Sequence, residues 1–149
     1  MDSIVINGGK ELKGSVIISG AKNAVLPMMA ASLLADGVTT ISNVPDLRDT
    51  RTMASLIEIT GAQVQLNYPE ISIDASTVHT LEAPYELVKT MRASFYVLGP
   101  ILGRFGKAKI SLPGGCAWGP RPVDFHLKAL EKMGASIRLK GGYVIAEAS

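Results

Sequence analysis

Two stretches of the sequence repeat each other: "GVTTIS" (37–42) with "LIEITGAQVQL" (56–66), and "GKAKIS" (106–111) with "ALEKMGASIRL" (129–139). The glycines that open the two copies are 69 positions apart, and the Gly-Ala pairs near their ends are 73 positions apart. A supersecondary unit that recurs every 70 residues or so buries its apolar face against other copies. The sequence therefore predicts two structural repeats.

The difference between the two offsets locates an insertion. The second copy has four more residues than the first between its strand and its helix. This longer connection contains "SLPGGCAWGPRPVDFH" (111–126), whereas the first copy has the plain connection "NVPDLRD" (43–49). Because loops that differ between repeats often carry function, this connection is the first place to look for chemistry.

Hydrophobic periodicity predicts that each copy contains a strand, a helix and a two-stranded hairpin. Asp49 is the expected N-cap of the second helix and Gly61 its stop, and the third helix is expected to bend near Pro100. The mixture favours the α/β (α+β) class. The predicted helices cover 20–37, 49–61, 84–102 and 121–134, and the predicted strands cover 3–8, 14–19, 38–42, 62–66, 71–75, 108–112, 135–139 and 143–147.

The composition excludes several classes of protein. A net charge of +2 with scattered basic residues does not favour nucleic acid as a partner. The longest apolar run, 24–35, contains Pro27 and falls short of the roughly 20 residues that a membrane-spanning helix needs. The single cysteine and the absence of a signal peptide lead us to expect a reducing cytoplasm.

The apolar character of the chain suggests that it is a fragment. Hydrophobic residues make up 47% of the 149 residues, and charged residues make up only 19%. The sequence ends on the strand-like "GGYVIAEAS" without a polar tail. We therefore expect the rest of a longer enzyme to cover part of this surface.

The cysteine lies in the inserted connection, five residues before Arg121. A free thiol has a pKa of about 8.5, and a neighbouring guanidinium and a helix N-terminus near Pro122 would both lower the pKa of Cys116. The two preceding glycines let the backbone approach a ligand closely. The alternative is a small buried thiol that fills a gap in the core; the glycine-rich insertion favours the reactive thiol.

Three cations at helix starts or on a helix suggest an anion site: Lys22, Arg92 and Arg121. Lys22 needs an anionic partner if it is buried, or it extends to solvent at the helix entry. Lys89 is expected on a solvated face. Asp124 and His126 also have ordinary helical roles as alternatives, and no nucleotide-binding or metal-binding spacing occurs. The residues alone thus indicate an anion-handling site with one activated thiol.

Four motifs in order resemble the N-terminal part of the UDP-N-acetylglucosamine enolpyruvyl transferase (1-carboxyvinyltransferase) family. They are "SGAKNAVLP" (19–27), "PYELVKTMRAS" (84–94), "LPGGCAWGPRPVDFH" (112–126) and "EKMGASI" (131–137). The resemblance implies repeated βαβαββ units of an inside-out α/β barrel, incomplete in this chain. Residues 1–20 would belong to the other domain, and 21–149 would form two repeat units of the first domain. The family needs no metal or organic cofactor.

The resemblance also implies a reaction and roles for individual residues. The family transfers an enolpyruvyl group from phosphoenolpyruvate to the 3-hydroxyl of UDP-N-acetylglucosamine, the first committed step of bacterial peptidoglycan synthesis. Cys116 matches the cysteine that protonates phosphoenolpyruvate or forms an adduct with it, and that fosfomycin alkylates. The positions that match substrate-binding residues are Lys22, Asn23, Arg92, Arg121, Pro122, Val123, Asp124, Phe125 and His126.

Two other functions stay open at this point. One is the related enolpyruvyl transferase that acts on shikimate 3-phosphate, against which the cysteine-containing loop argues. The other is a non-catalytic module that binds an anion or a nucleotide. If the chain is a fragment, we expect it to have little or no activity alone, because the family takes further catalytic residues from beyond Ser149.

Overall fold

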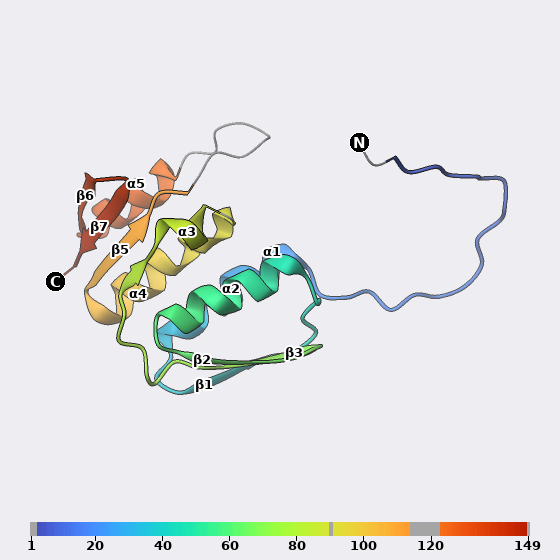
Figure 1. Ribbon diagram of the computed structural model, residues 1–149, viewed down its shortest axis with the longest axis horizontal. Helices are drawn as coiled ribbons and strands as arrows, with labels where there is room; N and C mark the ends of the chain where they lie inside the picture. Colours follow the sequence, from blue (N-terminus) through green and yellow to red (C-terminus); the bar gives the residue numbers. More distant parts are fainter. Residues whose placement is uncertain (1–2, 90, 114–122, 149) are drawn as a thin grey trace.

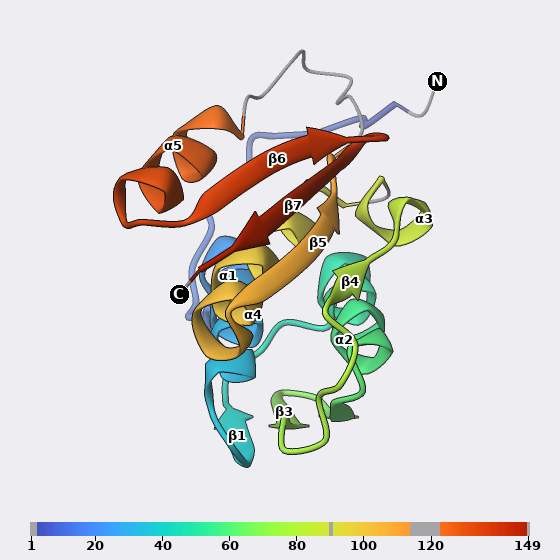
Figure 2. The same ribbon diagram turned by 90° about the vertical axis from the view of Figure 1, so that its left-hand side faces the viewer.

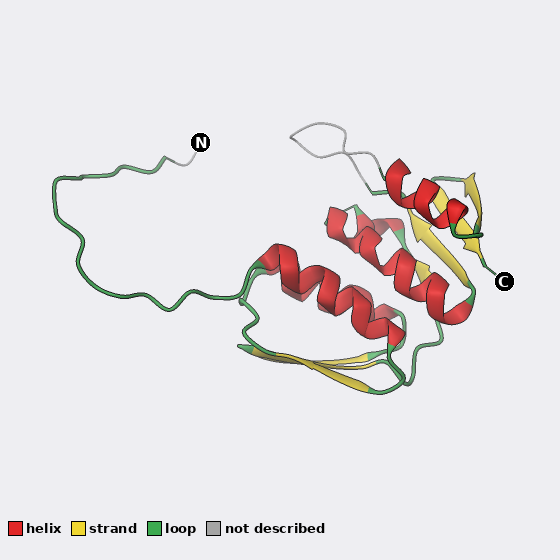
Figure 3. Cartoon of the chain, turned by 180° about the vertical axis from the view of Figure 1, so that it is seen from behind, coloured by secondary structure: helices red, strands yellow, loops and turns green. Residues whose placement is uncertain are grey.

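The computed structural model of the chain describes residues 3–89, 91–113 and 123–148. Two β-sheets form opposite sides of the folded part, and helices fill the space between them (Figure 1). Seen from behind, the residues before the first helix extend away from these layers (Figure 3). The α/β class that the periodicity predicts is confirmed.

The first unit combines helices with a three-stranded antiparallel sheet whose strand order is β1-β3-β2. Its predicted hairpin is confirmed as β2 and β3. Its elements are α1 (Lys22–Ala31), the 3-10 helix η1 (Ser32–Leu34), β1 (Val38–Ile41), α2 (Arg48–Ile59), β2 (Gln63–Asn67) and β3 (Glu70–Asp74).

The second unit has a four-stranded sheet in the order β4-β5-β7-β6 (Figure 2). The short strand β4 runs parallel to β5 and was not predicted, because two residues give no readable periodicity. The predicted hairpin of β6 and β7 is confirmed. The elements are β4 (Glu82–Ala83), α3 (Tyr85–Val88), the 3-10 helix η2 (Arg92–Val97), α4 (Leu98–Phe105), β5 (Lys107–Ser111), α5 (Asp124–Lys132), β6 (Ser136–Lys140) and β7 (Tyr143–Glu147).

The strand registers confirm the repeat residue by residue. Val38 pairs with Asp74 in the first sheet, and Lys107 pairs with Glu147 in the second. Lys107 is 69 positions after Val38, and Glu147 is 73 positions after Asp74, which are the two offsets that the sequence shows. The pairs β2–β3 and β6–β7 follow the second offset as well. The two copies therefore form the same strand arrangement, with the insertion between strand and helix.

Helix α2 buries the face that the sequence predicts. Met53, Leu56 and Ile57 are fully buried, and the helix gives way to Gly61 at φ 98°, as expected of a stop. Asp49, however, is not the N-cap: the helix begins at Arg48, and the Leu47 amide donates to the Thr50 hydroxyl. The expectation failed because the helix begins one residue earlier, which puts Asp49 in its first turn and makes Leu47 the N-cap residue.

The predicted strands at 3–8 and 14–19 are not formed. Their large apolar side chains are 77–102% exposed, and no backbone partner pairs with this segment among the described residues. A β-strand needs hydrogen bonds from a neighbouring strand, so β-branched residues alone do not create one. The affected side chains are Ile4, Val5, Ile6, Val16, Ile17 and Ile18.

The single long helix predicted at 84–102 is also wrong. The chain forms α3, η2 and α4 instead, and Met91 between the first two has extended backbone angles of φ −148° and ψ 117°. Pro100 is in the first turn of α4, where its missing N–H needs no partner, so it does not interrupt the helix. Apolar residues three or four positions apart fit both 3-10 and α-helical turns, so the periodicity did not reveal the breaks.

One arginine joins the two units. Nη1 of Arg104 on α4 donates to the carbonyl oxygens of Leu33 at 3.1 Å and Ala75 at 2.9 Å, and Nη2 bonds to Asp36 at 2.8 Å. These acceptors lie at the end of η1 and just after β3. Arg104 therefore ties the second unit to two separate elements of the first.

Candidate active site

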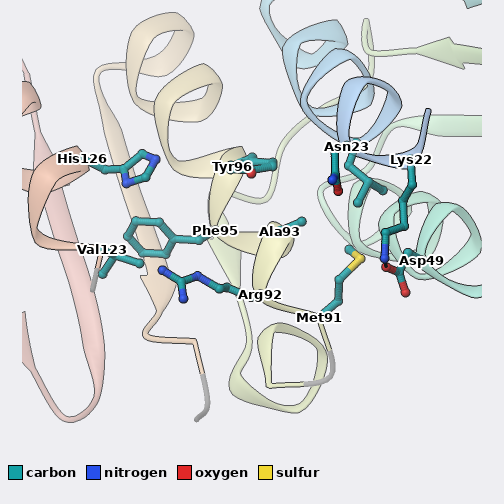
Figure 4. A pocket seen from close by; sticks show the side chains of 11 residues that line it. Lys22, Asn23, Asp49, Met91, Arg92, Ala93, Phe95, Tyr96, Val123 and His126 are labelled. Atoms are coloured by element: carbon teal, nitrogen blue, oxygen red, sulfur yellow. Dashed lines mark ion pairs between the residues drawn. The ribbon is translucent and has the colours of Figure 1, made fainter. Parts of the chain in front are cut away.

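A cavity of about 520 Å³ opens where several helices begin (Figure 4). Lys22 is the first residue of α1, Arg92 is the first residue of η2, and Asp49 is in the first turn of α2. Val123 directly precedes α5 and also lines the cavity. Helix N-termini present unpaired N–H groups and positive dipole ends, so their convergence favours an anionic ligand.

Lys22 has the anionic partner that the sequence calls for. Its ammonium nitrogen is 2.7 Å from Oδ2 of Asp49, and the two side chains are 46% and 33% exposed. The pair is therefore at the cavity wall, partly open to solvent. Asn23, next to Lys22 on α1, lines the same cavity.

Arg92 lines the cavity on the side opposite Lys22, next to Phe95 and Val123 (Figure 4). This placement follows from the break in the predicted long helix, because Met91 is extended and η2 begins at Arg92. Lys22 and Arg92 thus approach the cavity from two different helices. Two cations around one hollow can bind a ligand that carries more than one negative charge.

Lys89 behaves as the solvated residue that the sequence predicts. It forms an ion pair with Glu86, its ammonium is 5.3 Å from the centre of the Tyr85 ring, and it does not line the cavity. The hydrogen bond to Glu86, together with the charge of that carboxylate, raises the pKa of Lys89 above its ordinary value. Lys89 is therefore a charged surface residue and not part of the site.

Helix α5 contributes His126 to the cavity wall, and the residue before the helix, Val123, lines it as well. The His126 ring meets the Phe95 ring edge-on, with centroids 6.1 Å apart and an angle of 83°. Phe125 instead points outward and is 73% exposed. The structure therefore brings together Lys22, Asn23, Arg92, Val123 and His126, and it does not place Phe125 with them.

Asp124 lies between Val123 and His126 in the sequence but does not line the cavity. Its Oδ2 accepts a hydrogen bond from Lys128 at 3.2 Å, one turn along α5. Its Oδ1 is buried and has no hydrogen-bond partner within the described part of the chain. A buried carboxylate oxygen of this kind is costly to the fold unless a donor reaches it.

The remaining predicted residues, Cys116, Arg121 and Pro122, lie outside the described residues. In the ranges that the structure does describe, no group of three His, Cys, Asp or Glu side chains could hold a metal ion. No helix in those ranges is long and apolar enough to cross a bilayer.

Sequence reasoning missed Asp49 and Tyr96 as cavity residues. Asp49 was assigned a capping role. It is 27 positions from Lys22 in the sequence, and only the packing of α1 on α2 brings the two side chains together. The one available signal was a carboxylate at a predicted helix start. Nothing in the sequence distinguishes Tyr96 from a core aromatic residue.

Known proteins that are similar in sequence to this chain are named as 1-carboxyvinyltransferases. A sequence profile described as EPSP synthase (3-phosphoshikimate 1-carboxyvinyltransferase) matches residues 6–149. A protein of Chloroherpeton thalassium named UDP-N-acetylglucosamine 1-carboxyvinyltransferase is 56% identical, covering 99% of this chain and 34% of the relative. A Trichlorobacter lovleyi protein of the same name is 57% identical, covering 98% and 35%. The chain thus spans about a third of the length of the curated relatives it matches.

Solved structures show a similar fold. The enolpyruvyl transferase NikO from Streptomyces tendae superposes with a TM-score of 0.78 at 28% identity, covering 95% of this chain and 31% of that protein. EPSP synthase from Acinetobacter baumannii superposes with a TM-score of 0.67 at 20% identity, covering 95% and 33%. The second likeness shows the fold alone. Both matches extend over nearly the whole chain, so the two units are part of the fold these proteins have.

Proposed function

The chain belongs to the EPSP synthase family, and from this premise we propose that it supplies part of the active site of a UDP-N-acetylglucosamine 1-carboxyvinyltransferase. The reaction moves the enolpyruvyl group of phosphoenolpyruvate to the sugar 3-hydroxyl and releases phosphate. The names of the relatives at 56% and 57% identity support this substrate pair over shikimate 3-phosphate.

The observation that carries the proposal is the cavity between Lys22 and Arg92 at the meeting point of helix N-termini. Phosphoenolpyruvate carries about three negative charges at neutral pH, so its binding requires several cations and N–H donors. A volume of about 520 Å³ accommodates such a small ligand together with part of a sugar.

Each proposed role follows the resemblance at matching positions. Lys22, Arg92 and Arg121 bind phosphoenolpyruvate and the phosphate of the intermediate. Cys116 delivers a proton to the methylene carbon while the sugar oxygen bonds to the adjacent carbon and its hydroxyl proton passes to a base from the rest of the enzyme. The tetrahedral adduct then loses phosphate from that adjacent carbon and a proton from the new methyl group, which restores the double bond. Cations that contact the developing charge stabilise this species more than the substrates.

The nucleotide sugar is proposed to contact Asn23 and the segment Pro122, Val123, Asp124, Phe125 and His126. The unpaired Oδ1 of Asp124 supports this assignment, because a sugar hydroxyl is a suitable donor for it. The outward direction of Phe125 supports only a backbone contact at that position.

The wider setting is part of the proposal. Residues 1–20 pair with a second domain, 21–149 form two units of the first domain, and the missing two thirds supply further catalytic groups. The exposed apolar side chains of residues 4–18 support such pairing. The activity belongs to the first committed step of peptidoglycan synthesis in the bacterial cytoplasm. The 149-residue chain alone is expected to show little turnover.

A hybrid enzyme tests the proposal. Residues 1–149 replace the corresponding third of the Chloroherpeton thalassium relative, and phosphate release is measured with phosphoenolpyruvate and either UDP-N-acetylglucosamine or shikimate 3-phosphate. We expect activity with the nucleotide sugar only, and a loss of about 100- to 1,000-fold in Lys22→Ala. Activity with shikimate 3-phosphate alone would overturn the substrate assignment.

Fosfomycin provides an independent readout on the same hybrid. Mass spectrometry should locate the adduct at Cys116, and UDP-N-acetylglucosamine should accelerate its formation. An unreactive Cys116 in an active hybrid would exclude the thiol from the mechanism. A hybrid that binds ligand but turns over neither acceptor would favour the non-catalytic module.

A further inference from the structure

The Lys22–Asp49 pair joins the first residue of α1 to the first turn of α2 at the cavity wall. Both side chains line the cavity, so a carboxylate is next to the cation that the proposed function assigns to the phosphorylated substrate. A negative charge at this place weakens anion binding by simple repulsion. Its presence therefore needs a compensating role.

Asp49 is fixed more firmly than its exposure suggests. The next residue, Thr50, is fully buried, and its hydroxyl accepts a hydrogen bond from the Leu47 amide at 3.2 Å. The same hydroxyl is 2.7 Å from the Leu47 carbonyl oxygen and 2.9 Å from the Tyr68 hydroxyl. This network anchors the first turn of α2 to the loop before it and to the β2–β3 hairpin. The Asp49 backbone is thus part of a rigid junction.

Lys22 is flexible by comparison. Its side chain has four carbon–carbon bonds that rotate freely in solvent, and nearly half of its surface is exposed. Its ammonium has three N–H donors. One donor directed at Asp49 fixes the ammonium at the cavity wall and leaves two donors for oxygen atoms of a ligand.

We propose that Asp49 is a positioning residue, which holds Lys22 in the orientation needed to bind the phosphate or carboxylate of the phosphorylated substrate. This inference rests on the proposed function and deepens it. Because reactive geometry depends on sub-ångström placement, a freely moving Lys22 still attracts the anion and orients it poorly. Asp49 acts through Lys22 and does not itself contact the reacting atoms.

The test compares Asp49→Asn with Asp46→Asn. Asp46 forms an ion pair with Arg51 at 2.7 Å, close to the start of the same helix, and does not line the cavity. In the hybrid enzyme, Asp49→Asn should lower kcat about 10- to 100-fold. KM for phosphoenolpyruvate should change less than about threefold. The variant removes the repulsion between Asp49 and the anion, and this gain offsets the weaker binding by a less ordered Lys22. Asp46→Asn should leave both constants within about twofold, and Asp49→Glu should recover part of the loss.

A second measurement on the 149-residue chain separates this inference from the proposed function. NMR relaxation of the ¹³C nucleus at Cε of Lys22 should show a more mobile side chain in Asp49→Asn and no change in Asp46→Asn. Unchanged Lys22 mobility, or an unchanged kcat in an active hybrid, overturns the positioning role. If the hybrid is inactive but Lys22 becomes more mobile in Asp49→Asn, the proposed transferase activity is contradicted, while the inference that Asp49 restrains Lys22 is supported.

Discussion

The two repeat units share one strand register, yet their helices are buried to different extents. Helix α2 of the first unit buries five residues, whereas α5 of the second unit has no fully buried residue. Helix α1 packs along α2, whereas α5 packs against β6 and its Leu127 and Leu130 are only partly buried. Burial therefore depends on what packs against a helix and not on the repeat pattern that both helices share. The less buried helix is the one that follows the inserted connection.

The largest expected effect comes from truncating equivalent core positions in the two helices. Ile57 on α2 and Leu130 on α5 are 73 positions apart, but Ile57 is fully buried and Leu130 only partly. Ile57→Ala should lower the free energy of unfolding by about 3–4 kcal/mol, and Leu130→Ala by about 1 kcal/mol. Urea denaturation followed by circular dichroism measures both. Equal losses would mean that α5 is packed as tightly as α2.

The next comparison uses the glycines that end the two helices. Gly61 and Gly134 both have positive φ, 98° and 103°. A Cβ at Gly61 would lie 2.2 Å from Nδ1 of His79, whereas nothing is within 4 Å of a Cβ at Gly134. Gly134→Ala should therefore cost about 1 kcal/mol from backbone strain, and Gly61→Ala about 2–3 kcal/mol. Thermal unfolding of both variants gives the difference, and a milder effect at Gly61 would show that His79 moves aside easily.

A third prediction concerns the link between the units. Arg104 is only 17% exposed and binds two carbonyl oxygens and Asp36, while Arg51 is 62% exposed and pairs with the half-exposed Asp46. Arg104→Ala should cost about 2 kcal/mol, because it removes a charged donor from the carbonyl groups of two buried residues, Leu33 and Ala75. Arg51→Ala should cost less than about 0.5 kcal/mol. Calorimetry should also show a broader transition for Arg104→Ala if this side chain couples the units; an unchanged width would argue against coupling.

The smallest effect is a pH dependence confined to the first unit. Hydrogen bonds from the hydroxyl and amide of Ser76 lower the pKa of Asp74 below its ordinary value of 3.8. Protons therefore bind Asp74 more readily in the unfolded chain, so its stabilisation is present above the ordinary pKa of 3.8 and is lost as the pH falls through the folded-state pKa. Asp74→Asn should reduce the dependence of unfolding free energy on pH between 5 and 3. A variant with the unchanged slope would assign the acid sensitivity to other carboxyl groups.

Local signals in the sequence were sufficient for much of the fold. The offsets of 69 and 73 predicted two corresponding units, which the equivalent strand registers confirm, and the apolar face of α2 was read from Met53, Leu56 and Ile57. Lys22 was selected as a cation at a predicted helix start, Arg92 as a cation on a predicted helix, and Asn23 for its match to the family, and the structure places all three around one cavity. These features depend on neighbours within one or two turns, which the sequence displays directly.

The failures involve partners that are distant in the sequence. The segments 3–8 and 14–19 have the residues of strands but no neighbouring strand, and β4 is defined only by its pairing with β5. The break at Met91 gives no signal in the apolar periodicity of 84–102. Asp49 was read as a cap because Lys22 is far away in the chain.

The sequence by itself determined the repeat, the hairpins and the chemical identity of the cations, since these follow from local periodicity and residue type. The tertiary structure decided which helix is buried, where η2 begins and that Asp49 meets Lys22. Burial and ion pairing are properties of surfaces brought together by folding, and hydrogen-bonded strands exist only in pairs. The cation that the sequence revealed therefore acquired its fixed orientation only through the packing of α1 on α2.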